Sequence, residues 1–164
     1  MHVVTGTKTN VITAVEITHR DGADCPRLPA LVETTAKHFS VKEVSADKAY
    51  SSVRNHNVIA KAGGTPYIAF KANTTGAVGG LFEKMFHYYS FNRESFLAKY
   101  HKRSNVESTF NMIKAKFGSR TRSKTPTAKT NEALCKALCH NICCVIQSMF
   151  EFGIEPDFGN TPLN

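Results

Sequence analysis

The order of the predicted elements indicates an α/β domain. The residue pattern predicts a strand over residues 41–46, a helix over residues 51–61 and a second strand over residues 66–70. A strand–helix–strand order predicts a right-handed crossover, which makes the two strands parallel. The chain has 164 residues, of which 41% are hydrophobic and 21% are charged. This length and composition are typical of one globular domain with a real core.

The amino-terminal part of the chain predicts a β-hairpin. Residues 2–5 and 11–18 are rich in β-branched residues, and the run between them is rich in turn-forming residues. A loop then leads to a helix expected over residues 26–39, because proline is tolerated in a first helical turn. Ser51 or Ser52 caps the helix of the crossover. Asp47 follows the first parallel strand, and ligand-binding residues lie at the carboxyl ends of such strands.

The carboxyl-terminal half is predicted to be mainly helical. We expect a loop over residues 71–80, a short helix over 81–90, a lead-in to the next helix over 91–99, a basic loop over 119–126, a long helix over 127–152 and an irregular tail over 153–164. We therefore expect one domain over residues 1–152, with residues 71–99 as an insertion or lid-like segment.

The stretch from Tyr100 to Lys114 contains no proline or glycine and is expected to form one helix. Four polar residues at offsets of 0, 3, 7 and 14 share one helical face: Tyr100, Arg103, Glu107 and Lys114. A neighbouring apolar stripe contains Val106, Phe110, Ile113 and Phe117. By spacing alone, the polar face is equally compatible with an ordinary solvated helix surface.

Asp47 and Glu107 are candidate metal ligands. Two carboxylates that converge at the end of a parallel sheet form a hard-ligand site for Mg²⁺ or Mn²⁺. Such sites carry out phosphoryl transfer, although a site for two ions usually has three carboxylates. The competing interpretation of Asp47 is a helix N-cap that follows a strand.

The arrangement Y-x2-R-x3-E-x6-K at Tyr100, Arg103, Glu107 and Lys114 resembles the signature of the DDE transposases of prokaryotic insertion sequences, in the branch that carries this Y-R-E-K motif. The run Ala46-Asp47-Lys48-Ala49-Tyr50 is similar to the second-aspartate motif of that family. The predicted hairpin and the long helix with His140 and Asn141 resemble further parts of it. The resemblance covers residues 2–150.

The resemblance implies a ribonuclease H-like catalytic core. In that fold the first, central strand carries the first catalytic aspartate, whereas the matching segment here begins at the second strand. Asp21 and Asp24 lie in a loop after the hairpin and do not match the first aspartate. We therefore expect a truncated form that lacks its first strand and first catalytic aspartate. The strands on either side of the gap would then have unpaired edges.

The resemblance also implies a role for each matched residue. Asp47 and Glu107 would be the catalytic ligands of Mg²⁺ or Mn²⁺, and Tyr100 and Arg103 would contact phosphates at the transposon end. Lys114 would hold a phosphate near the cut. Further backbone contacts would come from Lys102, Lys116, Arg120, Arg122 and Lys124. The reaction would be strand cleavage by water, followed by attack of the freed 3′-hydroxyl on target DNA. A homodimer in a synaptic complex is an expected partner.

Two other functions remain open at this point. One is a catalytically inactive transposase remnant that still binds DNA through the surface from Arg103 to Lys124. The other is a ribonuclease H-like nuclease such as a Holliday-junction resolvase, against which the Y-R-E-K spacing argues. The net charge of +8 favours an anionic partner such as nucleic acid in each case.

The remaining features predict packing and location. Cys135, Cys139 and Cys143 follow each other at intervals of four residues beside His140, but one straight helix cannot close a zinc site alone. Small, reduced, buried cysteines that pack against the sheet are the favoured interpretation. We expect no apolar run that approaches the length of a membrane span and no signal peptide at the start of the chain. We therefore expect a cytoplasmic, nucleoid-associated prokaryotic protein with no membrane partner.

Overall fold

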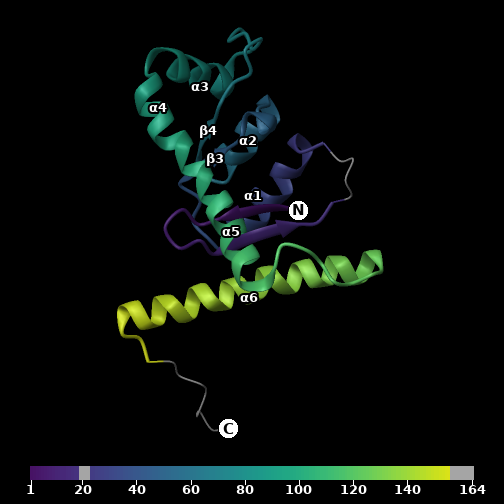
Figure 1. Cartoon of the computed structure of the whole chain (residues 1–164). Coiled ribbons are helices and arrows are strands. Elements are labelled where there is room, and N and C mark those ends of the chain that lie inside the picture. Colours follow the sequence, from purple (N-terminus) through teal and green to yellow (C-terminus); the bar gives the residue numbers. More distant parts are fainter. Residues whose placement is uncertain (19–22, 156–164) are drawn as a thin grey trace, which may run out of the picture. The chain divides into compact units, whose positions relative to one another are not determined.

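The computed structural model describes residues 1–18 and 23–155, which divide into two compact units, Met1–Asn111 and Met112–Asn164. The elements of the first unit are β1 (His2–Thr5), β2 (Ile12–Glu16), a 3₁₀ turn (Cys25–Arg27), α1 (Leu28–Ala36), β3 (Glu43–Ala46), a 3₁₀ turn (Lys48–Tyr50), α2 (Val53–Lys61), β4 (Thr65–Ile68), α3 (Gly80–Phe91), α4 (Arg93–Tyr100) and a 3₁₀ turn (His101–Ser104). α5 (Asn105–Phe117) passes from the first unit into the second, which also contains α6 (Pro126–Phe152). The elements are coloured along the sequence in Figure 1.

The predicted hairpin is confirmed. β1 pairs antiparallel with β2 (Figure 1). In this pairing, His2 lies opposite Glu16. The turn is closed by two backbone hydrogen bonds, from Gly6 N to Val11 O at 2.9 Å and from Asn10 N to Gly6 O at 3.0 Å. Asn10 has a φ of 56°, a left-handed conformation that asparagine tolerates better than most residues. Part of the predicted loop, residues 19–22, lies outside the described residues.

The predicted parallel strand pair is also confirmed. β3 pairs parallel with β4, and α2 connects them along the chain. The Ser52 side chain caps α2 by accepting a hydrogen bond from Asn55 N at 3.2 Å. In the part of the chain that the structure describes, each sheet has two strands, β1 with β2 and β3 with β4. The result is a mixed α/β fold with small sheets.

Two apolar clusters form the core of the first unit. One joins α1, α2 and β4 through Leu28, Val32, Ile59 and Ile68. The other lies between β4 and the helices α3 and α4 and contains Tyr67, Ala69, Phe70, Phe82, Met85, Phe96 and Tyr100. Residues 71–99, expected to be an insertion or lid-like segment, thus contribute buried side chains to this core. The expected domain limits remain a prediction.

The expectation of one helix from Tyr100 to Lys114 is wrong. α4 ends at Tyr100, a 3₁₀ turn spans His101–Ser104, and α5 begins at Asn105. Ser104 Oγ donates to the carbonyl of His101 at 2.9 Å, within this tighter turn. Because a 3₁₀ turn advances the chain at three residues per turn, the helical phase changes between Tyr100 and Glu107. The four signature residues therefore do not lie on one continuous helical face.

The long carboxyl-terminal helix is confirmed as α6 in the second unit. Thr125 Oγ1 accepts a hydrogen bond from Ala128 N at 3.3 Å and caps its start, and Pro126 lies in the first turn. Gly153 ends the helix with a φ of 62°, which favours glycine. The predicted irregular tail lies mostly outside the described residues, from residue 156 onward.

Two expectations about α6 need correction. By length and composition, α6 is long and apolar enough to cross a membrane, so the expectation that no run approaches that length is wrong. This is weak evidence for a membrane span, because core helices of soluble proteins pass the same test. The cysteines are free, but Cys135 and Cys139 are exposed rather than buried, because they lie on a side of α6 that the described chain leaves uncovered.

Candidate functional site

A groove of about 260 Å³ lies in the first unit between the edges of β1 and β3. Its lining includes residues of β1, α1, β3 and the first two turns of α5: Val3, Val4, Thr5, Leu28, Leu31, Val44, Ser45, Ala46, Val106 and Phe110. Four residues with a predicted role line the same groove: Asp47, Lys102, Arg103 and Glu107. The structure thus brings both predicted metal ligands to one cavity.

Asp47 lies at the carboxyl end of β3 with a half-exposed carboxylate. Its backbone occupies the cap position of the following 3₁₀ turn, where Tyr50 N donates to Asp47 O at 2.9 Å. Its side chain makes no capping hydrogen bond, and 53% of that side chain is exposed. Asp47 thus occupies the N-cap position that the alternative interpretation expected, but its side chain does not make the cap. The carboxylate is available for another partner.

Arg103 lies between the two carboxylates. Its Nη1 is 3.8 Å from Oδ2 of Asp47 and 3.9 Å from Oε1 of Glu107. Glu107 lies in the first turn of α5, where a negative charge is favourable, and 73% of its side chain is exposed. Asp47 and Glu107 are brought together by the fold, because one follows β3 and the other belongs to a helix much later in the chain.

Tyr100 is placed differently from the other signature residues. It is 8% exposed and belongs to the apolar core of α3, α4 and β4. The guanidinium of Arg103 lies over its ring, 4.9 Å from the ring centroid. A cation over an aromatic face is attracted by the ring electrons, so Tyr100 helps to orient Arg103. The predicted contact of Tyr100 with DNA phosphate remains a prediction.

Polar contacts from β3 fix the turn that carries Arg103. Ser45 Oγ donates to the carbonyl of Lys99 at 2.8 Å, and Glu43 pairs with Lys99 and Lys102. These two lysines hold the pKa of the Glu43 carboxyl below its usual range, with the Lys99 hydrogen bond as the largest cause. Sequence reasoning missed this contact set, because the partners belong to elements that are far apart along the chain.

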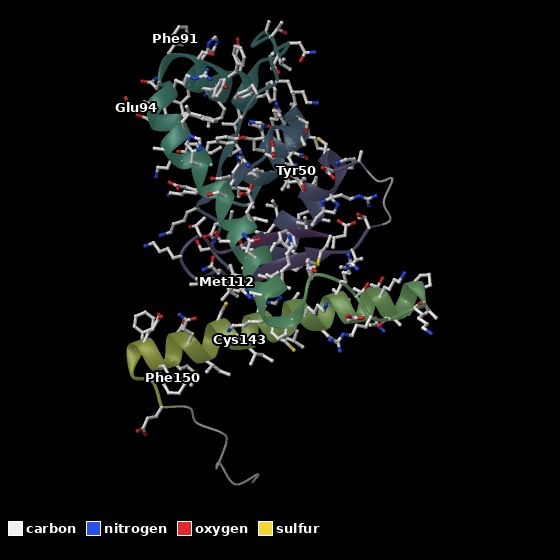
Figure 2. The ribbon with its side chains drawn as sticks, viewed as in Figure 1. Tyr50, Phe91, Glu94, Met112, Cys143 and Phe150 are labelled. Carbon is white, nitrogen blue, oxygen red and sulfur yellow. The ribbon has the colours of Figure 1, made fainter. Side chains whose placement is uncertain are left out.

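A second contact set holds the segment that follows Asp47. Tyr50 is labelled in Figure 2 and lies 3.0 Å, through its hydroxyl, from Nδ1 of His2. Asn55 is 1% exposed, and its side-chain amide donates to the carbonyls of Tyr50 at 2.7 Å and Cys25 at 3.0 Å. Burial, followed by the charges of Asp24 and Asp47, raises the pKa of Tyr50. The hydroxyl is therefore neutral near pH 7.

The second unit contains the other predicted DNA-binding residues. α5 carries Lys114 and Lys116 in its last turn, and Arg120 and Arg122 follow in the basic loop. All four side chains are exposed. This surface therefore offers positive charges to an anionic partner.

The basic loop is ordered by a carboxylate on α6 that sequence reasoning missed. Glu132 accepts hydrogen bonds from the backbone amides of Arg122, at 3.0 and 2.9 Å, and Ser123, at 2.9 Å. These bonds, with that of Ser123 first, lower the pKa of Glu132 to about 2. Lys136 Nζ donates to the carbonyl of Arg120 at 2.8 Å. Together, these bonds fold the loop so that the Arg120 and Arg122 side chains stay in solvent.

His140 of α6, in the second unit, is a buried side chain. His140 is 1% exposed, and its Nε2 lies 3.4 Å from Sγ of Cys144. Within the described residues, no group of three or more His, Cys, Asp or Glu side chains is arranged to hold a metal ion. Within the described residues, neither the cysteines of α6 nor the groove therefore contains such a group of three ligands.

Comparison with known proteins identifies the family. The family described as "transposase DDE domain" matches residues 1–142, which is most of the chain. No curated protein and no solved structure matches significantly. The match includes β1 to α5, both carboxylates of the groove and the first part of α6. The chain therefore belongs to the transposase DDE domain family.

Proposed function

We propose that this protein takes part in DNA transposition as a metal-dependent transposase domain of a prokaryotic insertion sequence, in the Y-R-E-K branch of the DDE family. One observation carries the proposal: Asp47 and Glu107 line one groove with Arg103 between them. The family match supports a role in transposition. The nucleoid in the cytoplasm is where such a domain would meet DNA.

The donor chemistry of the groove fits a hard divalent cation. Mg²⁺ is commonly held by one or two carboxylates together with waters and substrate phosphates. Asp47 and Glu107 supply two such carboxylates, both with exposed oxygens. Mg²⁺ or Mn²⁺ bound there would activate a water molecule and stabilise the leaving 3′-oxygen.

Arg103 and the basic residues of the second unit would position the DNA. The guanidinium of Arg103 lies close to both carboxylates without a short hydrogen bond to either, so it can turn towards a phosphate, which its planar fork binds well. Lys114, Lys116, Arg120 and Arg122 would neutralise further phosphates. Tyr100 would act on phosphate binding through its contact with Arg103. Two copies in a synaptic complex would allow both transposon ends to be cut.

The proposed ligand set is smaller than that of a complete DDE site. We propose a ribonuclease H-like core in which the residues of this chain supply two of the three carboxylates. The open edges of β1 and β3, with the groove between them, support this view. A site with two carboxylates would bind metal weakly, so cleavage by this chain alone should be slow.

A nicking assay tests the proposal. Supercoiled DNA that carries the ends of the element is incubated with the full chain and Mn²⁺, and nicked product is followed over time. We expect slow nicking that Glu107→Gln and Asp47→Asn each abolish. Glu94→Gln is the matched control, because Glu94 is an exposed glutamate in the first turn of α4 (Figure 2).

The possible outcomes separate the two leading functions. Nicking that is lost with Glu107→Gln but retained with Glu94→Gln supports the enzyme. Salt-sensitive DNA binding without nicking at any Mn²⁺ concentration contradicts the proposed catalysis and identifies an inactive DNA-binding remnant. Nicking that persists in both site variants indicates a contaminating nuclease and also contradicts the proposed site.

A further inference from the structure

A second cavity lies beside the groove in the first unit. Its volume is about 260 Å³, and it lies between the turn that joins β1 to β2 and the start of α5. We call it the hydroxyl pocket, and its lining residues are Thr7, Lys8, Lys102, Ser104, Asn105 and Ser108. Thr7 and Lys102 also line the groove, so the two cavities share part of their walls.

The lining of the hydroxyl pocket is suited to an anion. The six residues provide two ammonium groups, three hydroxyls and one amide, and they include no carboxylate. Lysine, serine, threonine and asparagine side chains are common partners of phosphate oxygens. Asn105 and Ser108 belong to the first turn of α5, where the helix dipole also favours negative charge. A phosphate group therefore matches the chemistry of the pocket.

Several donors of the hydroxyl pocket are available to a ligand. In the part of the chain that the structure describes, Lys8 makes no ion pair, and the hydroxyls of Thr7 and Ser108 make no hydrogen bond. All three residues are exposed. Lys102 pairs with Glu43 at 3.1 Å, but Glu43 also pairs with Lys99, so one positive charge of this group stays uncompensated.

Hydrogen bonds hold the two walls of the hydroxyl pocket together. Asn105 Nδ2 donates to the carbonyl of Gly6 at 3.0 Å and thereby joins the start of α5 to the turn between β1 and β2. Two backbone hydrogen bonds of Gly6 close that turn, which carries Thr7 and Lys8. Because both walls are fixed before a ligand arrives, binding of an anion orders few additional groups, which favours affinity.

We propose that the hydroxyl pocket binds a phosphate group of the DNA backbone beside the groove. Lys8 supplies positive charge from the turn between β1 and β2, and Ser108 donates a hydrogen bond from α5. Because Thr7 and Lys102 line both cavities, one DNA strand can reach from the groove into the pocket.

The contact has a positioning role. Phosphate contacts fix the register of a protein on DNA without reading its sequence, so the hydroxyl pocket sets where a strand lies relative to Asp47 and Glu107. The choice of DNA as the source of the phosphate rests on the proposed function, whereas the anion-binding chemistry of the pocket does not.

DNA binding in the absence of metal tests the proposal. A fluorescently labelled duplex is titrated with the full chain in EDTA at several salt concentrations, and anisotropy gives the affinity. Lys8→Gln should reduce the slope of log affinity against log salt by about 1, because one phosphate loses its cation. Ser108→Ala should weaken binding about tenfold with an unchanged slope, because a hydroxyl bonds to phosphate but carries no charge. Lys61→Gln, at an exposed position at the end of α2, is the control and should change neither quantity.

A second measurement separates DNA from free phosphate. The backbone amide signals of Thr7, Lys8 and Ser108 are followed by NMR while either inorganic phosphate or the duplex is added. The duplex should shift them at a concentration at least about tenfold lower than inorganic phosphate, because it makes further phosphate contacts at the same time. Shifts caused by inorganic phosphate alone would overturn DNA as the ligand.

Two results of the binding experiment would overturn the pocket itself. They are an unchanged affinity in Ser108→Ala and an equal slope change in Lys61→Gln and Lys8→Gln, since either result indicates general positive charge. The three substituted residues are exposed, so far-UV circular dichroism should stay unchanged. Intact nicking without an effect of Ser108→Ala on binding contradicts this inference alone. Binding that depends on Ser108 without any nicking contradicts only the proposed catalysis.

Discussion

Nη1 of Arg103 lies 3.8 Å from Oδ2 of Asp47, although Asp47 follows β3 and Arg103 lies in the turn between α4 and α5. The contact depends on the 3₁₀ turn, which Glu43 and Ser45 hold against β3. The same turn also places the guanidinium of Arg103 beside Glu107. The proposed roles of these three residues therefore depend on one local arrangement, and each can be tested separately.

Arg103→Gln should weaken DNA binding more than loss of one charge elsewhere on the first unit. Removal of one phosphate contact should reduce the slope of log affinity against log salt by about 1. Arg103→Lys should recover little of the loss, because an ammonium does not bind phosphate as a planar fork. Fluorescence anisotropy with labelled duplex DNA at several salt concentrations measures both effects.

Arg93→Gln is the matched control for that experiment. Arg93 also lies over an aromatic ring, 4.8 Å from the centroid of Tyr89, but it does not contact the groove carboxylates. Its substitution should leave the salt slope nearly unchanged. An equal loss in both variants would show that Arg103 contributes only general positive charge.

Asn55→Ala should destabilise the first unit and loosen the segment after Asp47. The buried amide of Asn55 donates to the carbonyls of Tyr50 and Cys25, and loss of such bonds costs about 1–3 kcal/mol. Urea unfolding measures the change in the free energy of unfolding. Asn57→Ala, at an exposed position on the same helix, should change it far less. Equal costs would contradict the role assigned to Asn55.

Stability of the first unit should fall as the pH drops below about 6.5. Burial lowers the folded-state pKa of His56, which is 0% exposed and packs against Phe70 and Phe82, although its hydrogen bond to Ser52 O opposes the shift. The unfolded chain therefore binds a proton at a higher pH than the folded chain. The contribution of His56 to the stability of the first unit is complete above the pKa of this histidine in the unfolded chain. It is lost as the pH falls towards the pKa of His56 in the folded chain.

Thermal unfolding between pH 5 and pH 8 checks this dependence. His56→Phe should flatten the profile in that range, whereas His38→Gln, at an exposed position, should not. A profile with the same slope in His56→Phe and in the unsubstituted chain would show that other groups cause the dependence.

The basic loop should stay folded to low pH, because Glu132 remains ionised. Its pKa of about 2 means that the carboxylate keeps its bonds to the amides of Ser123 and Arg122 as the pH falls from 7 to 4. This depressed pKa gives a contribution to stability that is present above the ordinary glutamate pKa and is lost as the pH falls through about 2. The chemical shifts of these two amide protons, followed by NMR, should titrate with a midpoint near the Glu132 pKa of about 2.

Glu132→Gln should release the loop at all pH values, because a neutral amide is a weaker acceptor for backbone N–H groups. Both amides should then exchange faster with solvent. Glu151→Gln, further along α6, serves as the control. A midpoint near 4.5 for the amide shifts would contradict the anchoring role of Glu132.

Local patterns in the sequence predicted most of the elements. The hairpin, the parallel pair of β3 and β4, the Ser52 cap and α6 follow from alternation, turn residues and capping, which act over a few residues. The turn after Tyr100 was missed, because the contacts of Glu43 and Ser45 that accompany it come from a strand far away in the sequence. Tertiary contacts override helix propensity at such positions.

Only part of the candidate site was predicted, because some of its contacts also join residues that are far apart in the sequence. Spacing and family resemblance selected Asp47, Arg103 and Glu107, and the fold brings all three to one groove. Neither spacing nor resemblance indicated His2 or Asn55, since their partners are found only once the chain is folded. The exposure of Cys135 and Cys139 was also missed, because periodicity shows that a helix has two faces but not which face is covered.

Paramagnetic broadening by Mn²⁺ tests the central claim most directly, because it needs neither DNA nor turnover. Substoichiometric Mn²⁺ is added to the isotope-labelled full chain, and backbone amide signals are recorded. The account predicts selective broadening around Asp47, Arg103 and Glu107, which disappears in the Asp47→Asn, Glu107→Gln double variant and persists in Glu94→Gln. Broadening centred on other residues, or unchanged broadening in the double variant, would contradict a metal site formed by Asp47 and Glu107.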